Sequence, residues 1–253
     1  SNKLAIINID DPCSNQIINK TKAKVLTYGF SNKADIYPSN INMSLSESKF
    51  DIFYQNKKFK IETNLIGDFN ISNILASILA CINMGIDIND IIQAINQFEL
   101  IPGRFESYKK QNGGIVIIDY AHTPDAFEKI LSLVKSIQPN YKIITLFGCG
   151  GDRDKDKRSI MGSLSEKFSD RIIITDDNPR DEDPNQIISQ IISGFKHDKY
   201  KVCNDRKRAI QEAFKKLNKN QTLLILGKGV EQYQIIKGKK IKHSDTQIIK
   251  ELL

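Results

Sequence analysis

The sequence predicts an α/β protein whose second part forms a doubly wound, mostly parallel sheet. Two observations predict this class. From about residue 104 onward, short apolar runs alternate with amphipathic helical segments, and a polar or glycine-rich loop follows each apolar run. Repeated units of this kind bury continuous apolar strands beneath helices on both faces of a sheet. Residues 1–103 have a different pattern, so we expect two domains, residues 1–103 and residues 104–253.

The first domain is expected to begin with strands. Short β-branched or apolar runs predict buried strands at residues 4–9 and 24–28. Three alternating segments follow, and they predict an antiparallel hairpin region. These segments are residues 41–45, 50–54 and 59–63.

Two helices and a linker complete the first domain. Apolar residues at helical spacing predict a helix over residues 70–84, with Gly85 as its C-terminal stop. A second helix is expected over residues 88–98. The segment Leu-Ile-Pro-Gly-Arg at residues 100–104 interrupts the helical pattern, and we interpret it as the link between the domains.

The second domain is expected to contain successive strand–loop–helix units. Its predicted strands are residues 115–118, 142–147, 171–175, 199–203 and 222–226. Its predicted helices are residues 124–137, 159–168, 184–193, 206–217 and a last helix from about residue 244. Proline at a first helical position supports the starts at Pro124 and Pro184, and Asp183 is expected to cap the helix that Pro184 begins.

Composition excludes several classes of protein. With 253 residues, of which 40% are hydrophobic and 26% charged, the chain is neither a disordered tail nor a small disulfide-stapled module. Its longest apolar stretches fall far short of the ~20 residues that a membrane helix needs, and no secretory signal opens the chain. We therefore expect a soluble, cytoplasmic protein without a membrane partner. The first methionine is Met43, from which we expect the chain to be a fragment.

The net charge of +7 raises the question of a nucleic-acid partner. Lysines are spread along the chain rather than clustered, and the abundance of Ile, Lys and Asn is typical of an A/T-rich genome. We therefore expect no nucleic-acid binding. The four cysteines form no C-x-x-C pair, which argues against a disulfide framework and a zinc site and predicts buried thiols.

Ligands of such sheets bind where the strands reach their carboxyl ends, and the unusual loops of this chain fall there. Residues 148–151 (Gly-Cys-Gly-Gly) resemble half of a dinucleotide fingerprint but lack its G-x-G-x-x-G spacing. The other interpretation is a tight turn that projects Arg153 toward a ligand. Most of the charged run at residues 152–158 is expected to be solvated. The phosphate-loop pattern G-x-x-x-x-G-K-[ST] is absent from the sequence.

The segment Asp-Asn-Pro-Arg at residues 177–180 places opposite charges close together on a turn that proline stiffens. Such a group suits a zwitterion, with Arg180 binding a carboxylate and the side chains before the proline binding an ammonium group. The alternative is a surface loop in which Arg180 pairs with Asp181 or Asp183, at little gain in stability. The residue pattern leaves both interpretations open.

His122 follows a predicted strand and precedes a helix N-terminus, where anions commonly bind. A hydrogen-bonded packing role is the alternative for a single histidine. His197 and His243 lie in lysine-rich turns and receive no role.

At these loops the chain resembles the Mur ligase family, and within it the branch that adds meso-diaminopimelate. The matching strings are Asn-Ile-Asp-Asp at 8–11, Thr-Tyr-Gly at 27–29, Gly-Asp-Phe-Asn at 67–70, Pro-Gly-Arg-Phe-Glu at 102–106, Asp-Tyr-Ala-His-Thr-Pro-Asp at 119–125, Phe-Gly-Cys-Gly-Gly-Asp-Arg-Asp at 147–154, Thr-Asp-Asp-Asn-Pro-Arg at 175–180 and Gly-Lys-Gly at 227–229. The resemblance implies the end of a central Mur ligase ATPase domain at residues 1–103. A Rossmann-like, amino-acid-binding C-terminal domain is implied at residues 104–253.

The resemblance also implies ATP-dependent amide-bond formation in peptidoglycan synthesis. ATP and Mg²⁺ are the implied cofactors, UDP-MurNAc-L-Ala-D-Glu and meso-diaminopimelate are the implied substrates, and a monomer is the implied state. A carboxylate of the UDP-linked dipeptide becomes an acyl phosphate, which the diaminopimelate amine attacks. Catalysis of this kind depends mainly on positioning and charge neutralisation.

Motif positions of the family imply two groups of ligand-binding residues. The diaminopimelate group is Arg153, Asp177, Asn178, Pro179, Arg180, Gly227 and Glu231. The nucleotide group is Asn70, Arg104, Asp119 and His122. Arg180 is implied to select diaminopimelate over lysine, because lysine leaves the guanidinium without a carboxylate partner, at a cost of about 1–3 kcal/mol. No catalytic residue and no metal ligand is assigned in this chain.

Two departures from the family pattern concern the site and the ATP phosphates. Val230 stands where relatives commonly carry histidine, next to Glu231. The phosphate loop and the magnesium ligands of the family are missing, so we expect this chain to be part of a longer ligase or half of a split one. The alternatives are a catalytically inactive, substrate-binding remnant and a folylpolyglutamate-type ligase, which the segment at residues 177–180 disfavours.

Overall fold

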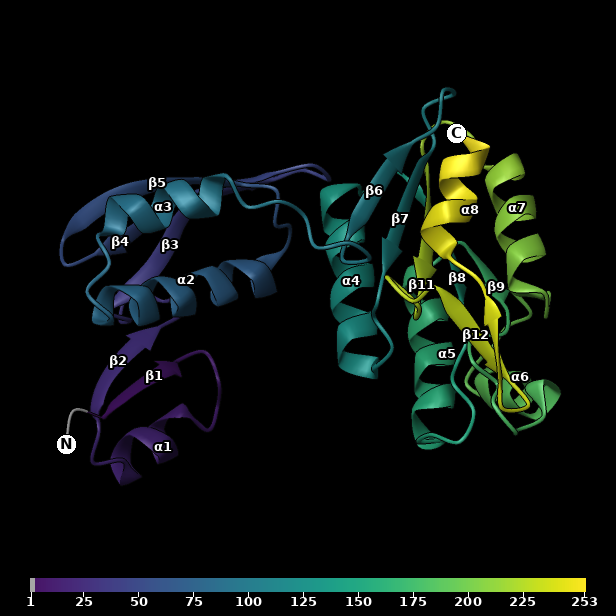
Figure 1. Cartoon of the computed structure of the whole chain (residues 1–253), viewed down its shortest axis with the longest axis horizontal. Coiled ribbons are helices and arrows are strands. Elements are labelled where there is room, and N and C mark those ends of the chain that lie inside the picture. The colour runs from purple at the N-terminus through teal and green to yellow at the C-terminus, as the bar shows by residue number, and fades with distance from the viewer. Residues whose placement is uncertain (1–2) are drawn as a thin grey trace. The chain divides into compact units, whose positions relative to one another are not determined.

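The computed structural model describes residues 3–253, which form two compact units divided between Leu100 and Ile101. Each unit has its own main sheet and its own hydrophobic core (Figure 1). Within the described residues, every helix is too short or too polar to traverse a lipid bilayer.

The first unit contains a five-stranded sheet in the order β1-β2-β3-β4-β5. β1 to β3 pair in parallel, and β3 to β5 pair in antiparallel fashion, as the hairpin prediction required. The strands are β1 (Leu4–Asn8), β2 (Lys24–Tyr28), β3 (Ile36–Met43), β4 (Ser48–Tyr54) and β5 (Lys57–Thr63). β3 begins earlier than expected because Pro38 lies within it and interrupts the apolar alternation.

Helices α2 (Asp68–Asn83) and α3 (Ile88–Asn96) form the core of the first unit with this sheet. The apolar stripe that predicted α2 is buried, as Ile71, Leu75 and Ile78 are fully inaccessible to solvent. Asp87 caps α3 by accepting a hydrogen bond from the Asn89 N–H at 2.8 Å.

The second unit is built on a six-stranded sheet in the order β10-β9-β8-β11-β7-β6. All neighbouring strands are parallel except β6 and β7, so the predicted mostly parallel sheet is confirmed. The strands are β6 (Glu106–Lys109), β7 (Ile115–Asp119), β8 (Lys142–Phe147), β9 (Arg171–Ile174), β10 (Tyr200–Val202) and β11 (Gln221–Leu226).

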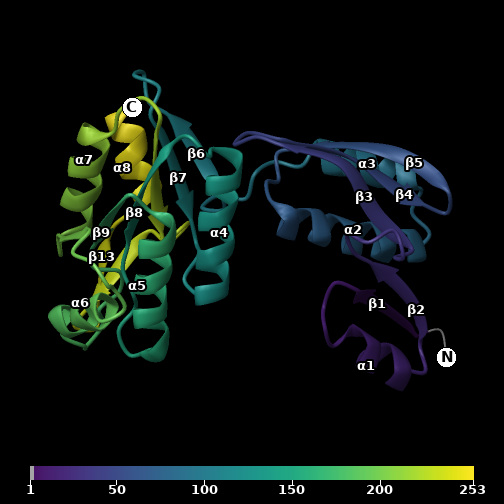
Figure 2. The same ribbon diagram turned by 180° about the vertical axis from the view of Figure 1, so that it is seen from behind.

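Helices cover both faces of the second sheet, which is why its central strands are mostly apolar on both faces. Every second strand residue, such as Val116 and Leu223, belongs to the core shared with α7 and α8. The intervening residues face the other helices, and the Phe147 ring of β8 lies 4.8 Å from the Phe127 ring of α4. Figure 2 shows α4 and α5 on the near face, with α7 and α8 behind. The helices are α4 (Pro124–Ile137), α5 (Asp156–Phe168), α6 (Pro184–Ile192), α7 (Arg206–Lys216) and α8 (Asp245–Leu252).

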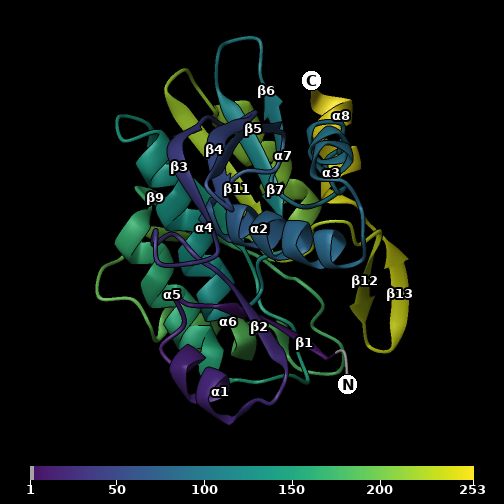
Figure 3. The ribbon, with the colours of Figure 1, turned by 90° about the vertical axis from the view of Figure 1, so that its left-hand side faces the viewer.

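Four elements were not predicted from the sequence. Three of them are α1 (Ser14–Lys20), the edge strand β6 and a hairpin strand, β12 (Tyr233–Ile236). The fourth is β13 (Lys239–Lys242), which pairs with β12 in antiparallel fashion and is exposed along its whole length. Figure 3 shows this hairpin projecting beside the second unit. Because neither face of β13 is buried, its residues carry no hydrophobic alternation that a sequence pattern could detect.

The expectation that the cysteines are buried is wrong for Cys13, which is exposed, and for Cys81 and Cys203, which are half-buried. Cys149 alone among the four is buried, and burial raises the pKa of its thiol to about 12. All four are free thiols.

Candidate functional site

Four loops of the second unit meet at one edge of its sheet. They follow β7, β8, β9 and β11, whose parallel pairing brings their carboxyl ends to the same edge. These loops are residues 120–123, 148–155, 175–183 and 227–232. The last three contain the whole diaminopimelate group predicted from the sequence, so the fold brings these residues to one end of the sheet.

The loop after β8 lies directly against the loop after β9. The Gly151 N–H donates to the Asn178 carbonyl at 2.9 Å. A Cβ at Gly151 would lie 1.9 Å from the Pro179 carbonyl oxygen, which only glycine avoids. The glycines at residues 148–151 therefore serve close packing of two loops, which favours the tight-turn interpretation over a dinucleotide fingerprint.

A buried ion pair also joins these two loops. Arg158 is fully buried at the start of α5, and both of its Nη atoms donate to the Glu182 carboxylate at 2.8 Å. Arg158 also donates to the Gly150 carbonyl at 2.9 Å, and Glu182 accepts from the Asp152 N–H at 3.0 Å. These hydrogen bonds, above all those from Arg158, lower the pKa of Glu182 to about 2. Residues 152–156 are exposed, as expected for most of the charged run, and Arg158 is the buried exception.

Arg180 is held by its backbone in an uncommon conformation, with φ of 54°. Its N–H donates to the Ile235 carbonyl at 2.9 Å and its carbonyl accepts from the Lys237 N–H at 2.7 Å, so the β12–β13 hairpin fixes it. The guanidinium donates to the Gly151 carbonyl at 2.7 Å. Within residues 3–253 no salt bridge joins Arg180 to an acidic residue, so the alternative surface pair with Asp181 or Asp183 is not formed.

Asn178 and Glu231 are joined through a lysine that the sequence prediction missed, Lys228. Its side chain is fully buried, and Nζ donates to Asn178 Oδ1 at 3.0 Å and to Glu231 Oε2 at 2.8 Å. Asn178 Nδ2 donates to the same Glu231 oxygen at 2.9 Å. Burial opposes ionisation of Glu231, but the hydrogen bonds from Lys228 and Asn178 outweigh it and lower the pKa of this carboxyl.

Asp177 lies beside this network and is 8% exposed. Its Oδ1 is 4.0 Å from Lys228 Nζ, and its backbone carbonyl accepts from Gln234 Nε2 at 2.8 Å. Gly227 has a φ of 111° and packs closely against the Asp177 carboxylate. A Cβ at this position would lie only 2.8 Å from Asp177 Oδ2. The structure thus places Asp177, Asn178, Gly227 and Glu231 together.

Arg153 and Val230 lie outside the buried network. The Arg153 side chain is exposed, and its Nη1 donates to the Asp152 carbonyl at 2.9 Å. Val230 is 57% exposed, and the hydrogen bonds of Glu231 do not involve its side chain. Valine in place of the family's histidine therefore leaves the Lys228–Glu231 contact intact.

Two of the nucleotide-group residues, Arg104 and His122, contact Tyr120 in the second unit. The exposed Arg104 guanidinium lies 5.1 Å from the centre of the Tyr120 ring, and the exposed His122 ring contacts it edge-on at 4.6 Å. His122 Nδ1 is 2.8 Å from the Tyr120 carbonyl, which fixes the ring against its own backbone. A cation and two aromatic rings are thereby available to an anionic, planar ligand.

Asp119 and Asn70 use their side chains on the protein backbone. Both Asp119 carboxylate oxygens accept backbone N–H groups, from Phe105 and from Ala121, each at 2.8 Å. Burial raises the pKa of Asp119 despite these hydrogen bonds. Asn70 lies in the first unit, where its Nδ2 donates to the Ile66 carbonyl at 2.8 Å.

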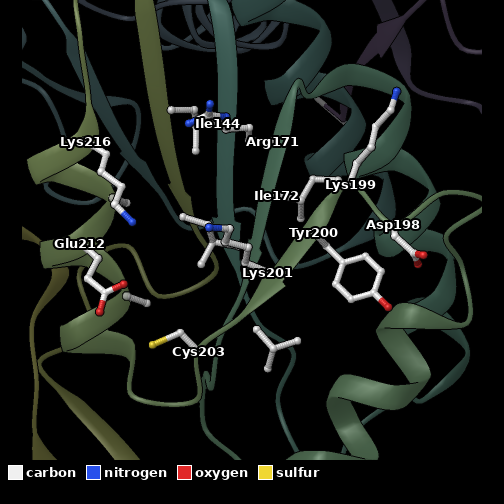
Figure 4. A pocket seen from close by; sticks show the side chains of 14 residues that line it. Ile144, Arg171, Ile172, Asp198, Lys199, Tyr200, Lys201, Cys203, Glu212 and Lys216 are labelled. Carbon is white, nitrogen blue, oxygen red and sulfur yellow. The ribbon is translucent and has the colours of Figure 1, made fainter.

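A cavity of about 380 Å³ lies elsewhere in the second unit, between β9, β10 and α7. Figure 4 shows Glu212 and Lys216 of α7 pointing into it. None of the predicted site residues lines this cavity. The chemistry of residues 177–180 and 227–231 therefore identifies the candidate site better than cavity volume does.

The second unit is a Rossmann-like domain whose charged side chains gather at the carboxyl ends of its parallel strands. Comparison with known proteins identifies the family to which this domain belongs. Residues 103–229 match the family described as Mur ligase, glutamate ligase domain, and residues 1–81 match the Mur ligase middle domain. The chain belongs to the Mur ligase family, which confirms the resemblance inferred from its motifs.

Similar relatives are named UDP-N-acetylmuramoyl-L-alanyl-D-glutamate–2,6-diaminopimelate ligases. The one numbered 1 in Clostridium acetobutylicum is 38% identical over 255 residues, covering 100% of this chain and 53% of the relative. That of Aquifex aeolicus is 41% identical over 252 residues, covering 99% and 51%. A solved structure of a ligase of this name aligns with a TM-score of 0.66 and 32% identity, over 98% of this chain and 52% of that one. The chain spans about half the length of the curated relatives it matches.

Proposed function

We propose that this chain forms the amino-acid-binding domain, and part of the ATP-binding domain, of a ligase that adds meso-diaminopimelate to UDP-MurNAc-L-Ala-D-Glu in peptidoglycan synthesis. The names of the relatives at 38–41% identity support this substrate pair. The proposal includes a cytoplasmic, monomeric protein that binds no nucleic acid. The two proposed domains are residues 1–103 and residues 104–253.

The observation that carries the proposal is the environment of Arg180. Its guanidinium is anchored by backbone carbonyls of Gly151 and Asn178, so its charge is not neutralised by a protein carboxylate. Two carboxylates, of Asp177 and Glu231, lie on the adjoining segments, and the positive charge of Arg180 contributes to the lowered pKa of Glu231. A cation without a carboxylate partner beside two anions suits the ammonium and carboxylate of an amino acid's distal end.

The proposed reaction joins this amine to an activated acid. A free carboxylate is a poor acylating group because oxide is a poor leaving group, whereas phosphate leaves readily from an acyl phosphate. The contribution of residues 177–180 and Glu231 is to hold diaminopimelate by its distal end, so that the other amine is presented for attack. Arg153, exposed at the same sheet edge, is proposed as a further contact to this substrate.

ATP and Mg²⁺ belong to the same proposal. When bound, they supply the phosphoryl group and neutralise its charge. Arg104 and His122 fit a nucleotide, because a solvent-exposed cation and ring flank Tyr120. Asp119 is proposed to support that site through the backbone contacts of its side chain. Asn70 is proposed as a nucleotide-binding residue of the first unit, where its side chain donates to the Ile66 carbonyl.

ATP-dependent amide formation with meso-diaminopimelate or L-lysine, measured in the full-length protein, tests the proposal. We expect diaminopimelate to be preferred by about tenfold to a hundredfold, and Arg180→Met to remove most of that preference. Arg208→Met is the matched control, because Arg208 is 71% exposed and paired only with Glu212. A preference for lysine in the unsubstituted protein would contradict the proposal. Turnover with neither amine would favour the inactive-remnant alternative.

A further inference from the structure

Lys228 occupies an unusual place for a lysine. It lies between Gly227 and Gly229 after β11, and its side chain has no solvent exposure. Lysine is among the residues least often fully buried, since an ammonium group loses its hydration inside a protein. A fully buried lysine at a strand end calls for compensating partners, and it has them in the diaminopimelate group.

The partners of Lys228 are the residues assigned to the substrate. Nζ donates to Asn178 Oδ1 at 3.0 Å and to Glu231 Oε2 at 2.8 Å, and it lies 4.0 Å from Asp177 Oδ1. Its ammonium also lies 6.0 Å from the centre of the Tyr233 ring. Three side chains from two loops therefore converge on one buried cation.

The contact with Lys228 determines the orientation of the Asn178 and Glu231 side chains. Asn178 Oδ1 accepts from Lys228 and from the Ile235 N–H at 3.0 Å, so Nδ2 must point to Glu231. Glu231 Oε2 receives both Lys228 and Asn178, which leaves Oε1 for a ligand. Lys228 thus orients groups that face the substrate, although its own ammonium is enclosed by protein.

Lys228 also sets the local charge. Asp177 and Glu231 carry two negative charges, and Lys228 cancels one of them. The nearby buried Arg206 does not alter this count, because its guanidinium is paired with Asp245 at 2.7 Å. With Arg180 included, these four side chains sum to zero, which matches the zwitterionic end of diaminopimelate. Arg153 is left out of this sum because it is exposed, so that solvent screens its charge. Without Lys228 the sum is −1, which matches the purely cationic end of lysine.

We infer that Lys228 is a positioning residue that sets amino-acid selectivity, acting through Asn178 and Glu231 rather than by touching the substrate. This inference rests on the proposed function. Arg180 recognises the extra carboxylate of diaminopimelate, and Lys228 disfavours ligands whose distal end carries a positive charge alone. Selectivity for the amino acid therefore depends both on Arg180, which contacts the ligand, and on Lys228, which contacts Asn178 and Glu231.

The test is the ratio of kcat/KM for meso-diaminopimelate to that for L-lysine, measured in the full-length protein. Lys228→Met is expected to lower this ratio about tenfold, because one positive charge a few ångströms from the distal end is removed. Lys240→Met is the matched control, since Lys240 is exposed but lies 4.7 Å from the same Tyr233 ring. It should leave the ratio unchanged.

Two further variants extend the test, and the first of them, Glu231→Gln, keeps the inference testable if Lys228→Met does not fold. Glu231→Gln shifts the local charge in the opposite direction and is expected to raise the ratio. Adding Glu231→Gln to Lys228→Met restores the zero sum and is expected to return the ratio toward that of the unsubstituted protein. A ratio that stays constant across these variants while thermal stability falls would overturn the inference. The proposed function would survive that result, because it depends on the diaminopimelate preference of the unsubstituted protein.

Discussion

Asp176 is held against Asn204 by two contacts. Its backbone N–H donates to the Asn204 carbonyl at 3.3 Å, and its Oδ1 accepts from Asn204 Nδ2 at 3.3 Å. Burial of this carboxyl outweighs the hydrogen bond and raises its pKa from 3.8 to about 6. Its neighbour Asp177 has a different partner, since Asp177 Oδ1 lies 4.0 Å from Lys228 Nζ.

The raised pKa of Asp176 predicts a pH dependence of stability. The folded protein binds this proton more tightly than the unfolded chain, so the contribution of Asp176 to stability falls as pH rises from about 4 to about 6. Asp176→Asn is expected to be more stable than the unsubstituted protein at pH 7 by about 1 kcal/mol, a figure reduced for partial solvent screening. Urea unfolding at pH 4 and pH 7 measures this difference. Asp125→Asn, at a side chain 77% exposed, is the control. An unchanged slope with pH in Asp176→Asn would contradict the assignment.

The buried pair of Arg158 and Glu182 predicts a larger loss. Glu182→Gln leaves the fully buried Arg158 without a counter-charge, so we expect a loss of about 3–5 kcal/mol in the free energy of unfolding. The pKa of Glu182 is lowered to about 2, so its contribution is fully present above pH 4.5 and is lost as pH falls toward 2. Glu212→Gln breaks an exposed pair with Arg208 and should cost under about 1 kcal/mol. Chemical denaturation of both variants at pH 7 compares them, and equal losses would contradict the prediction.

Much of the fold could be predicted because its strands and helices are strongly patterned. The predicted bounds of α4 and β8 coincide with the observed ones, since Pro124 marks the start of the helix and a mostly apolar run defines the strand. The β12–β13 hairpin was missed because its contacts include backbone hydrogen bonds between Arg180 and residues 235 and 237, which leave no trace in side-chain pattern. This hairpin nevertheless fixes the backbone of Arg180.

The sequence predicted the charged loop residues of the candidate site, but it did not predict the buried charged residues that hold them in place. Arg180 was recognised from the charges of residues 177–180, and Glu231 only from its match to a family motif. Lys228 and Arg158 were missed because burial of a charged side chain depends on partners distant in sequence, such as Asn178 and Glu182. A lysine flanked by glycines directly after an apolar strand was the available signal.

The close approach of two loops predicts the effect of adding one methyl group. Gly151→Ala places a Cβ 1.9 Å from the Pro179 carbonyl, so the loops that carry Arg153 and Arg180 must separate. We expect a loss of more than about 2 kcal/mol in stability and a weaker affinity for diaminopimelate. Gly85→Ala is the control, because its Cβ meets nothing within 4 Å and only its φ of 87° is strained, at a cost of about 1 kcal/mol. Thermal unfolding and substrate titration of both variants measure the effects. A Gly151→Ala protein as stable as Gly85→Ala would argue against this loop contact.

Asp119 and Arg104 are predicted to affect nucleotide binding by different routes. Phe105 adopts a φ of 46° and donates its N–H to Asp119, whose other oxygen accepts the Ala121 N–H. Asp119→Asn turns an NH₂ group toward one of these donors, so we expect a loss of about 1–3 kcal/mol in stability. Arg104→Met removes an exposed cation over Tyr120 and should raise the KM for ATP without lowering the melting temperature. Thermal unfolding together with ATP kinetics in the full-length protein separates the two roles. If Arg104→Met lowered the melting temperature as much as Asp119→Asn while leaving the KM for ATP unchanged, Arg104 would be structural and the nucleotide assignment of this cluster would be wrong.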